Sequence, residues 1–440
     1  MALNIAAHDA LEGALIDDVL GKPLGRMVSR WGVVGDLRTY PSPQGLPQLS
    51  VVRAAAGTDS SGGGTTLTGA GRAWDNLPNA LWSAIGEALE RYSAVDHLGE
   101  QRVWAKWDEL PSAITVANIP RCSDTEYDHP QCPLRRIACD EAIRWVEGID
   151  LASQRATWVP AVMACYRLRR VRPAERFWYQ ISTGYAVYSD PTEATVRGLL
   201  EVIERDAVAL TWLQKLPLPS VGWEAHSAVV RHLLDWSTGH FLETHLFDAT
   251  TDLGVPTVYC LQRAPHDPQL QHVVSAASDR GMAQAAEKAL FECITLRETL
   301  LHSPAVPDDV AQFREISDGA RYMGASDRAA GFSFLLNAKR CASRHAGHTD
   351  IPSDPKVALD HLLRVLSEKG MTPVVVDRTS DELRQTGMTA VCVIVPQLQP
   401  MSLLPLAQYK GHGRLYEAPR RMGYPPLGEV DLNPWPQPFA

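Results

Sequence analysis

Two segments of this chain contain the same short pattern, Glu-x-x-Glu-Arg, and apolar residues flank it in both. In the first, Glu87, Glu90 and Arg91 follow Ser83, and the spacing places Ser83, Glu87 and Glu90 on one face of a helix. Carboxylates on an otherwise apolar helix are costly unless a cation or a metal compensates them. We therefore interpret this face as a candidate site, and the alternative is a solvated, salt-bridged helix surface.

The second segment repeats the pattern with Glu201, Glu204 and Arg205, again among Leu, Val and Ile. A third helix-like segment places Glu292 among apolar residues, with Arg297 five positions later. Carboxylates without cysteine or histidine suit hard cations, and Mg²⁺ usually binds together with phosphates. Arginines beside them suit phosphate oxygens. The three segments together predict one Mg²⁺–nucleotide site that is built from helices.

The elements that must position these residues alternate between helix and strand along most of the chain. We expect helices around 83–92, 191–212, 226–236, 282–300 and 356–370, and strands around 49–53, 145–162, 241–247, 256–261, 371–377 and 389–396. The segment Thr68–Arg72, with Gly69 and Gly71, is interpreted as a loop whose backbone could approach a phosphate. The pattern predicts an α/β (α+β) fold.

The composition argues against several classes of function. Hydrophobic residues make up 45% of the 440-residue chain and charged residues 21%, which is typical of a globular protein. The net charge of −9 argues against electrostatic binding of nucleic acid, which usually needs a basic protein. No apolar run is long enough for a membrane span and no secretory signal begins the chain, so we expect a cytoplasmic protein. No C-x-x-C pair occurs among the eight cysteines, which favours reduced thiols over a zinc site.

The ordered motifs resemble the ATP-binding signature of the YcaO superfamily. They are Ser-x3-Glu-x2-Glu-Arg from Ser83, Glu-x2-Glu-Arg-Asp from Glu201, and Ala-Leu-x-Glu ending at Glu292. The resemblance covers roughly residues 25–440 and implies a YcaO-like fold, with mixed sheets flanked by helices and pseudo-duplicated Glu-bearing helices. It divides the chain into an N-terminal lead-in helix at 1–25 and a catalytic domain at 26–440, with a proline-rich tail at 431–440.

The same resemblance implies ATP and Mg²⁺ as cofactors and assigns roles to individual residues. The implied Mg²⁺ ligands are Glu87, Glu90, Glu201, Glu204 and Glu292. The implied nucleotide contacts are Ser83, Glu87, Arg91, Glu193, Glu201, Arg205 and Arg297.

The C-terminal tail has a proline at every second position, Pro434, Pro436 and Pro438, before it ends at Ala440. This spacing forbids a helix and favours an extended segment of low entropy. One interpretation is a disordered proline-rich end. The other is a rigid segment that delivers the terminal carboxylate into a site, as the resemblance to azoline-forming family members implies. On that resemblance we assign catalytic roles to Pro436, Pro438 and Ala440, whose carboxylate is a candidate base.

The resemblance implies an ATP-dependent cyclodehydratase of natural-product (RiPP) biosynthesis. A Cys, Ser or Thr side chain of a ribosomal precursor peptide attacks the preceding amide, whose oxygen is phosphorylated and leaves, giving a thiazoline or oxazoline. Expected partners are the precursor peptide, a ThiF-like (ubiquitin-activating-like) leader-binding protein and a second copy in a homodimer. Whether a flavin-dependent dehydrogenase acts afterwards stays open. No leader-binding domain is expected within the first 25 residues.

Two alternatives remain open. The same ATP chemistry in this family can form a thioamide or a macrocyclic amidine. The chain could also be a non-catalytic scaffold subunit of a biosynthetic complex. Ala70, Ser189 and Thr295 favour the scaffold, because many relatives have Lys, Asn and Gln there. The retained carboxylates argue against it, since buried carboxylates without a function are destabilising.

Overall fold

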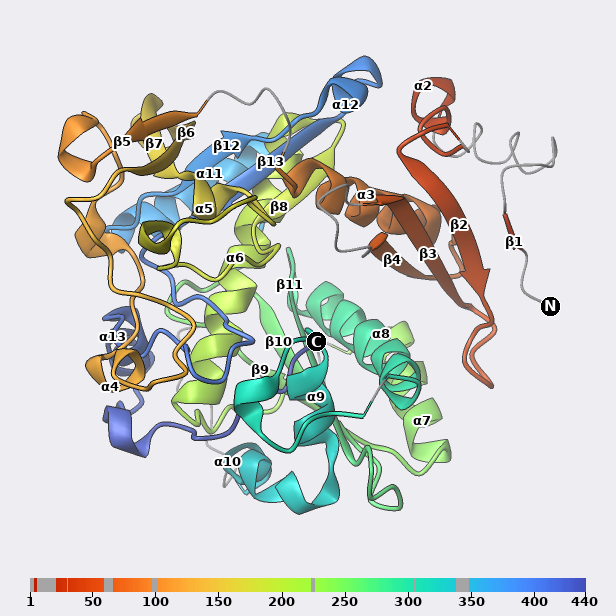
Figure 1. Cartoon of the computed structure of the whole chain (residues 1–440). Coiled ribbons are helices and arrows are strands. Elements are labelled where there is room, and N and C mark those ends of the chain that lie inside the picture. The colour runs from red at the N-terminus through yellow and green to blue at the C-terminus, as the bar shows by residue number, and fades with distance from the viewer. Residues whose placement is uncertain are drawn as a thin grey trace. The chain divides into compact units, whose positions relative to one another are not determined.

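The computed structural model describes residues 4–5, 21–29, 31–58, 66–96, 102–222, 226–303, 305–337 and 348–440 (Figure 1). The chain forms two compact units, and each is interleaved along the sequence. The first unit comprises residues 1–114, 138–199 and 373–394, and the second comprises 115–137, 200–372 and 395–440.

The first unit begins with a four-stranded antiparallel sheet in the order β1-β2-β3-β4. Its strands are β1 (Asn4–Ile5), β2 (Val34–Tyr40), β3 (Leu49–Thr58) and β4 (Thr66–Trp74), with the short helix α2 (Lys22–Gly25) before β2. Helix α3 (Leu77–Ala94) packs on β3 and β4. It begins at Asn76, whose side chain accepts a hydrogen bond from Asn79 N at 3.0 Å. This is the capping interaction that fixes the start of a helix.

A six-stranded antiparallel sheet completes the first unit, in the order β5-β6-β12-β13-β8 with β7 paired to β6. Its strands are β5 (Val103–Ala105), β6 (Ile143–Asp150), β7 (Arg155–Pro160), β8 (Tyr185–Tyr188), β12 (Val374–Asp377) and β13 (Thr389–Ile394); the helices α5 (Ala161–Ala164) and α12 (Asp381–Gln385) accompany it. Leu81, Ile85 and Leu89 of α3 share one hydrophobic core with Val187 of β8 and Ala390 of β13. Helix α3 therefore packs against both sheets of this unit.

The second unit contains a three-stranded antiparallel sheet in the order β11-β10-β9. Its strands are β9 (Glu243–Asp248), β10 (Thr257–Arg263) and β11 (His272–Ser278); its helices are α4 (Asp124–Tyr127), α7 (Ala228–Gly239), α8 (Met282–Leu301), α9 (Asp318–Gly324), α10 (Ser333–Leu336), α11 (Pro355–Glu368) and α13 (Arg414–Arg421). Helix α8 packs on β10 and β11, and α7 packs on α8 and β9. Short 3-10 turns occur in both units. They lie at Trp107–Glu109 and Pro173–Glu175 in the first, and at Val116–Asn118, Val310–Gln312, Ser326–Phe332 and Glu429–Asp431 in the second.

Helix α6 (Pro191–Leu213) belongs to the first unit as far as residue 199 and to the second from residue 200. Asp206 anchors its second half, because Asp206 is fully buried and its Oδ2 pairs with Arg414 Nη2 at 2.7 Å. The same carboxylate accepts a hydrogen bond from Gln399 N at 2.8 Å, and Arg414 also pairs with buried Asp252 at 2.7 Å. A buried carboxylate is tolerated when it is paired and hydrogen-bonded in this way.

The predicted α/β (α+β) class is confirmed, and most of the predicted helices and strands have a counterpart. The ladders between the described strands are antiparallel, and isolated parallel bridges join Val28 to Val34 and Ala113 to Trp158. The expected lead-in helix at 1–25 differs where the chain is described, because Asn4–Ile5 is a strand and only Lys22–Gly25 is helical. Residues 6–20 lie outside the described residues. Within the described part of the chain, no helix is long and apolar enough to cross a membrane.

Candidate functional site

The first Glu-x-x-Glu-Arg segment lies on α3, as predicted. Glu87 is half-buried, and its Oε2 accepts a hydrogen bond from Ala70 N of β4 at 2.9 Å. Its Oε1 pairs with Arg91 Nη2 at 2.9 Å, one helical turn later. Glu90 Oε1 accepts from Val187 N of β8 at 3.3 Å. A backbone N–H therefore orients each carboxylate, which the sequence did not predict.

Gly69 and Gly71 do not form the loop that the sequence analysis expected. Both lie in β4, where a Cβ atom on Gly71 would be 1.8 Å from Ala80 O of α3. A Cβ atom on Gly69 would be 2.3 Å from Ala84 O. The physical reason for these glycines is thus the close packing of α3 on β4, and this packing brings Ala70 N to Glu87.

The remaining predicted residues of the first unit differ in exposure. Ser83 is exposed on α3. Glu193 lies in the first turn of α6, where Asp190 Oδ1 accepts a hydrogen bond from Thr192 N at 2.8 Å. The side chain of Glu193 is only 8% exposed and pairs with Arg197 Nε at 3.0 Å.

The second Glu-x-x-Glu-Arg segment forms an acid–arginine cluster in the second unit, which we define as Glu201, Glu204, Arg205 and Glu292. Arg205 pairs with Glu204 at 3.2 Å and with Glu201 at 3.5 Å. Glu204 Oε2 also accepts a hydrogen bond from Ser278 N, at the end of β11, at 2.9 Å. Glu292 of α8 is close enough to raise the pKa of both Glu204 and Arg205. The structure therefore brings together α6, α8 and β11 around these charges.

Burial raises the pKa of Glu204 to about 7. Arg205 lowers this pKa, but the negative charges of Glu292 and Glu201 raise it further. For Arg205, burial lowers the pKa, yet the three carboxylates outweigh burial and the net shift is upward. Three carboxylates around one arginine leave an excess of negative charge, which is an environment that favours an added cation.

Arg297 has a different environment from the one predicted. It is buried against the sheet, where its Nε donates to Gln262 Oε1 at 2.8 Å and its Nη1 to Leu270 O at 2.6 Å. Its Nη2 donates to Gln262 O at 3.1 Å. Burial also lowers its pKa. Through these hydrogen bonds Arg297 connects α8 to the strand β10, which is a structural role.

The C-terminal tail is an ordered and buried segment of the second unit, so the interpretation as a disordered end was wrong. Pro436 and Pro438 are buried, and Ala440 is partly exposed. The tail is held by Trp212 Nε1 of α6, which donates to Trp435 O at 3.0 Å, and by Phe439, whose ring meets Tyr259 of β10 edge-on at 5.5 Å. The proline spacing thus produces a fixed extended segment.

The predicted Mg²⁺ ligands divide into two groups, with Glu87 and Glu90 in the first unit and Glu201, Glu204 and Glu292 in the second. Over the described ranges of the chain, no three acidic, histidine or cysteine side chains are arranged so that they could hold a metal ion by themselves. Mg²⁺ bound with phosphates needs only one or two protein carboxylates. The donor chemistry present, carboxylates beside arginines, fits a Mg²⁺–nucleotide.

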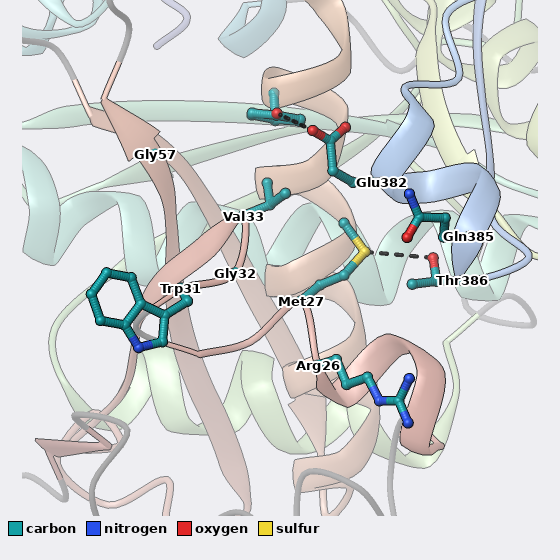
Figure 2. Close-up of a pocket in the computed structure, with 10 residues that line it drawn as sticks. Arg26, Met27, Trp31, Gly32, Val33, Gly57, Glu382, Gln385 and Thr386 are labelled. Carbon is teal, nitrogen blue, oxygen red and sulfur yellow. Dashed lines mark hydrogen bonds between the residues drawn. The ribbon is translucent and has the colours of Figure 1, made fainter.

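A pocket of about 430 Å³ lies on the first unit and uses none of the predicted site residues (Figure 2). Met27, Val33 and the exposed Trp31 line it from the segment before β2, and Gln385 and Thr386 line it from α12. At its upper end in Figure 2, Glu382 accepts a hydrogen bond from Tyr92 OH of α3 at 3.2 Å. Burial, followed by the charge of Glu382, raises the pKa of Tyr92 to about 12.

A family model for the YcaO cyclodehydratases, described as binding ATP and Mg²⁺, matches residues 75–399. The chain belongs to this YcaO family. The match spans α3, α6 and α8, and with them all five predicted carboxylates.

The chain is also similar to individual proteins. A solved heterocyclase in complex with substrate and cofactor is 23% identical, with a TM-score of 0.79, over 96% of this chain and 57% of that one. The structure of YcaO from Methanopyrus kandleri, bound with AMPPCP and Mg²⁺, is 16% identical, with a TM-score of 0.61, over 89% of this chain and 91% of that one. An uncharacterised protein in the tfuA 3′ region of Rhizobium leguminosarum bv. trifolii is 30% identical over 42% of this chain. The chain spans 43% of that protein's length.

Proposed function

We propose that this YcaO protein is an ATP-dependent cyclodehydratase, which converts Cys, Ser or Thr of a ribosomal precursor peptide to thiazoline or oxazoline. The observation that carries the proposal is the acid–arginine cluster, in which burial, followed by the charges of Glu292 and Glu201, raises the pKa of Glu204 to about 7. Such a cluster of partly buried carboxylates costs stability unless a ligand uses it.

Glu87, Glu90, Glu201, Glu204 and Glu292 are the residues proposed to hold Mg²⁺, and Ser83, Glu87, Arg91, Glu193, Glu201 and Arg205 are proposed to contact the nucleotide. When bound, ATP supplies a phosphoryl group and Mg²⁺ offsets phosphate charge. Arg91 and Arg205 each already pair with a glutamate, which pre-orients the guanidinium group. We omit Arg297 from the phosphate contacts, because the sheet engages its donors.

The chain's own residues then position the peptide and move a proton. The substrate side chain attacks the preceding amide carbon as the Ala440 carboxylate takes the proton from its hydroxyl or thiol. Pro436 and Pro438 hold that carboxylate in place through the buried tail. This attack closes the five-membered ring. Once the former amide oxygen carries the phosphoryl group that ATP would supply, it leaves as phosphate, and loss of the amide proton forms the C=N bond of the azoline. This ordered tail favours azoline formation over thioamide or amidine formation.

We also propose that the protein works in a complex with the peptide substrate, a ThiF-like leader-binding partner and a second copy of this chain. A flavin-dependent dehydrogenase that oxidises the azoline is the expected next enzyme. Support comes from the related heterocyclase, which was solved with substrate and cofactor.

The first test is ATP binding by calorimetry with and without Mg²⁺, in wild type, Glu90→Gln and Glu204→Gln. Gln can still accept the hydrogen bonds from Val187 N and Ser278 N, so these variants remove charge and keep the backbone contacts. Glu298→Gln, on the exposed side of α8, is the matched control. We expect Mg²⁺-dependent binding that the first two variants lose and the control keeps. A folded wild type that binds no nucleotide would leave only the scaffold interpretation.

The second test addresses the tail. Appending one glycine after Ala440 moves the terminal carboxylate and keeps the buried prolines. We expect ATP binding to persist while the loss of one water from a peptide substrate, followed by mass spectrometry, disappears. Unchanged dehydration would exclude the carboxylate as the base.

A further inference from the structure

The first unit carries a strongly basic segment that the proposed reaction does not use. We define the arginine loop as residues 165–176, which contain five arginines and one glutamate within a chain of net charge −9. The loop connects α5 to the segment before β8 and includes the 3-10 turn Pro173–Glu175. A segment with this much charge of one sign attracts ligands of the opposite charge.

The loop is held in one conformation by buried contacts. Its apolar residues Cys165, Leu168 and Ala174 are buried, with exposed fractions of 1%, 4% and 8%. Buried Arg144 of β6 pairs with Glu175 through contacts of 2.7 and 2.6 Å, and its Nη1 donates to the loop carbonyl of residue 169 at 2.8 Å. These ties direct the apolar residues inward and fix the backbone that carries the arginines.

Two of these arginines have backbone angles that side chains other than glycine rarely adopt. Arg167 has φ 61° and Arg170 has φ 50°. Left-handed backbone is unfavourable for residues with a Cβ atom and persists only when the surroundings impose it. Strain of this kind is characteristic of functional surfaces.

Guanidinium groups lie close to two aromatic rings in and beside the loop. Arg172 lies over the ring of Trp104, 4.2 Å from its centroid, and Arg144 lies 5.4 Å from the same ring. Arg167 lies 5.3 Å from the ring centroid of Tyr166. The rings thus orient the arginines through cation–π contacts.

We propose that the arginine loop binds an acidic segment of the peptide substrate. The acidic groups packed against the loop are already paired, since Glu175 pairs with Arg144 and Asp96 pairs with Arg102. Exposed Arg170, Arg172 and Arg176 therefore present net positive charge. Oriented guanidinium groups bind carboxylates through paired hydrogen bonds. A long polyanion such as RNA would also meet the repulsion of a chain with net charge −9.

This inference rests on the proposed function for its substrate class, and its test separates the two. The probe is a short fluorescein-labelled peptide of alternating Glu and Gly, followed by fluorescence anisotropy at increasing NaCl. Alternating Gln and Gly gives the neutral counterpart, and single-stranded RNA serves as a competitor. Calorimetry of Mg²⁺–ATP on the same preparations reports the nucleotide site independently.

Three variants distinguish the effect of a lost charge on peptide binding from an effect on folding. Arg170→Glu reverses one exposed charge in the loop, and Arg155→Glu, at an exposed position of β7 in the same unit, is the matched control. Arg170→Asn removes the charge at a position where Asn tolerates a positive φ, so its thermal stability should equal or exceed that of wild type.

We expect the acidic peptide to bind more tightly than the neutral one, with an affinity that falls as salt rises. Arg170→Glu should weaken it about tenfold and Arg155→Glu less than about twofold, with Arg170→Asn also weaker than wild type. Equal binding of the two peptides, equal losses in both Glu variants, wild-type binding by Arg170→Asn, or preferential binding of RNA would each overturn the proposal. A wild-type protein that binds no Mg²⁺–ATP would instead refute the proposed function.

Discussion

Glu204 should make the metal-free, nucleotide-free protein less stable as the pH rises. Its pKa is about 7 in the folded chain and ordinarily 4.5, so between these values the folded state holds a proton that the unfolded state has lost. The free energy of unfolding therefore falls with rising pH across this window, by about 1.4 kcal/mol per pH unit. From pH 4.5 to pH 7 the total from this one residue is about 3 kcal/mol.

The perturbation that isolates this contribution is Glu204→Gln. Gln cannot ionise, but it still offers an oxygen to Ser278 N, so the variant should lack this fall in stability. Near pH 5 the two proteins should differ little, and at pH 8 the variant should be more stable by up to about 3 kcal/mol. Glu298→Gln, which is exposed on α8, controls for the loss of a carboxylate as such.

The assay is urea unfolding at several pH values between 5 and 8 in EDTA without nucleotide, with the free energy extrapolated to water. The reasoning is refuted if wild type and Glu204→Gln show the same dependence on pH. Ligand binding should have the opposite dependence. A cation prefers the ionised carboxylate, so Mg²⁺–ATP affinity should rise with pH and level off only above pH 7, once Glu204 is fully ionised.

Two further substitutions test the packing. Gly71→Ala should destabilise the first unit by about 1–3 kcal/mol or more in thermal or urea unfolding, because its Cβ would be 1.8 Å from Ala80 O. Gly86→Ala on α3 has no atom within 4 Å of its Cβ and should be neutral or slightly stabilising, so equal losses in both variants would contradict the packing argument. Arg297→Lys should lower stability by roughly 3 kcal/mol and leave Mg²⁺–ATP affinity unchanged, since it breaks buried contacts to β10. A specific loss of ATP affinity in a stably folded Arg297→Lys protein would restore the phosphate contact.

Local sequence was sufficient for much of the fold. The Glu-x-x-Glu-Arg segments lie on helices because apolar residues recur at helical spacing around them, as Leu81, Ile85 and Leu89 do on α3. The sequence failed at β4, where two glycines suggested a loop. Glycine in a strand is recognisable as a close contact only once the partner helix is known. It also missed β11, a buried strand whose seven residues show no alternation of polar and apolar side chains.

The sequence by itself determined which residue types are available for chemistry: five glutamates and their arginines at helical spacing, and a tail that proline keeps extended. The tertiary structure decided what each of them contacts. It gave Glu87, Glu90 and Glu204 a backbone N–H partner each, directed Arg297 into the sheet, and buried the tail. The physical reason is that spacing along a helix sets which residues share a face. Burial, hydrogen-bond partners and pKa depend on segments that are distant in the chain, such as Ser278 beside Glu204.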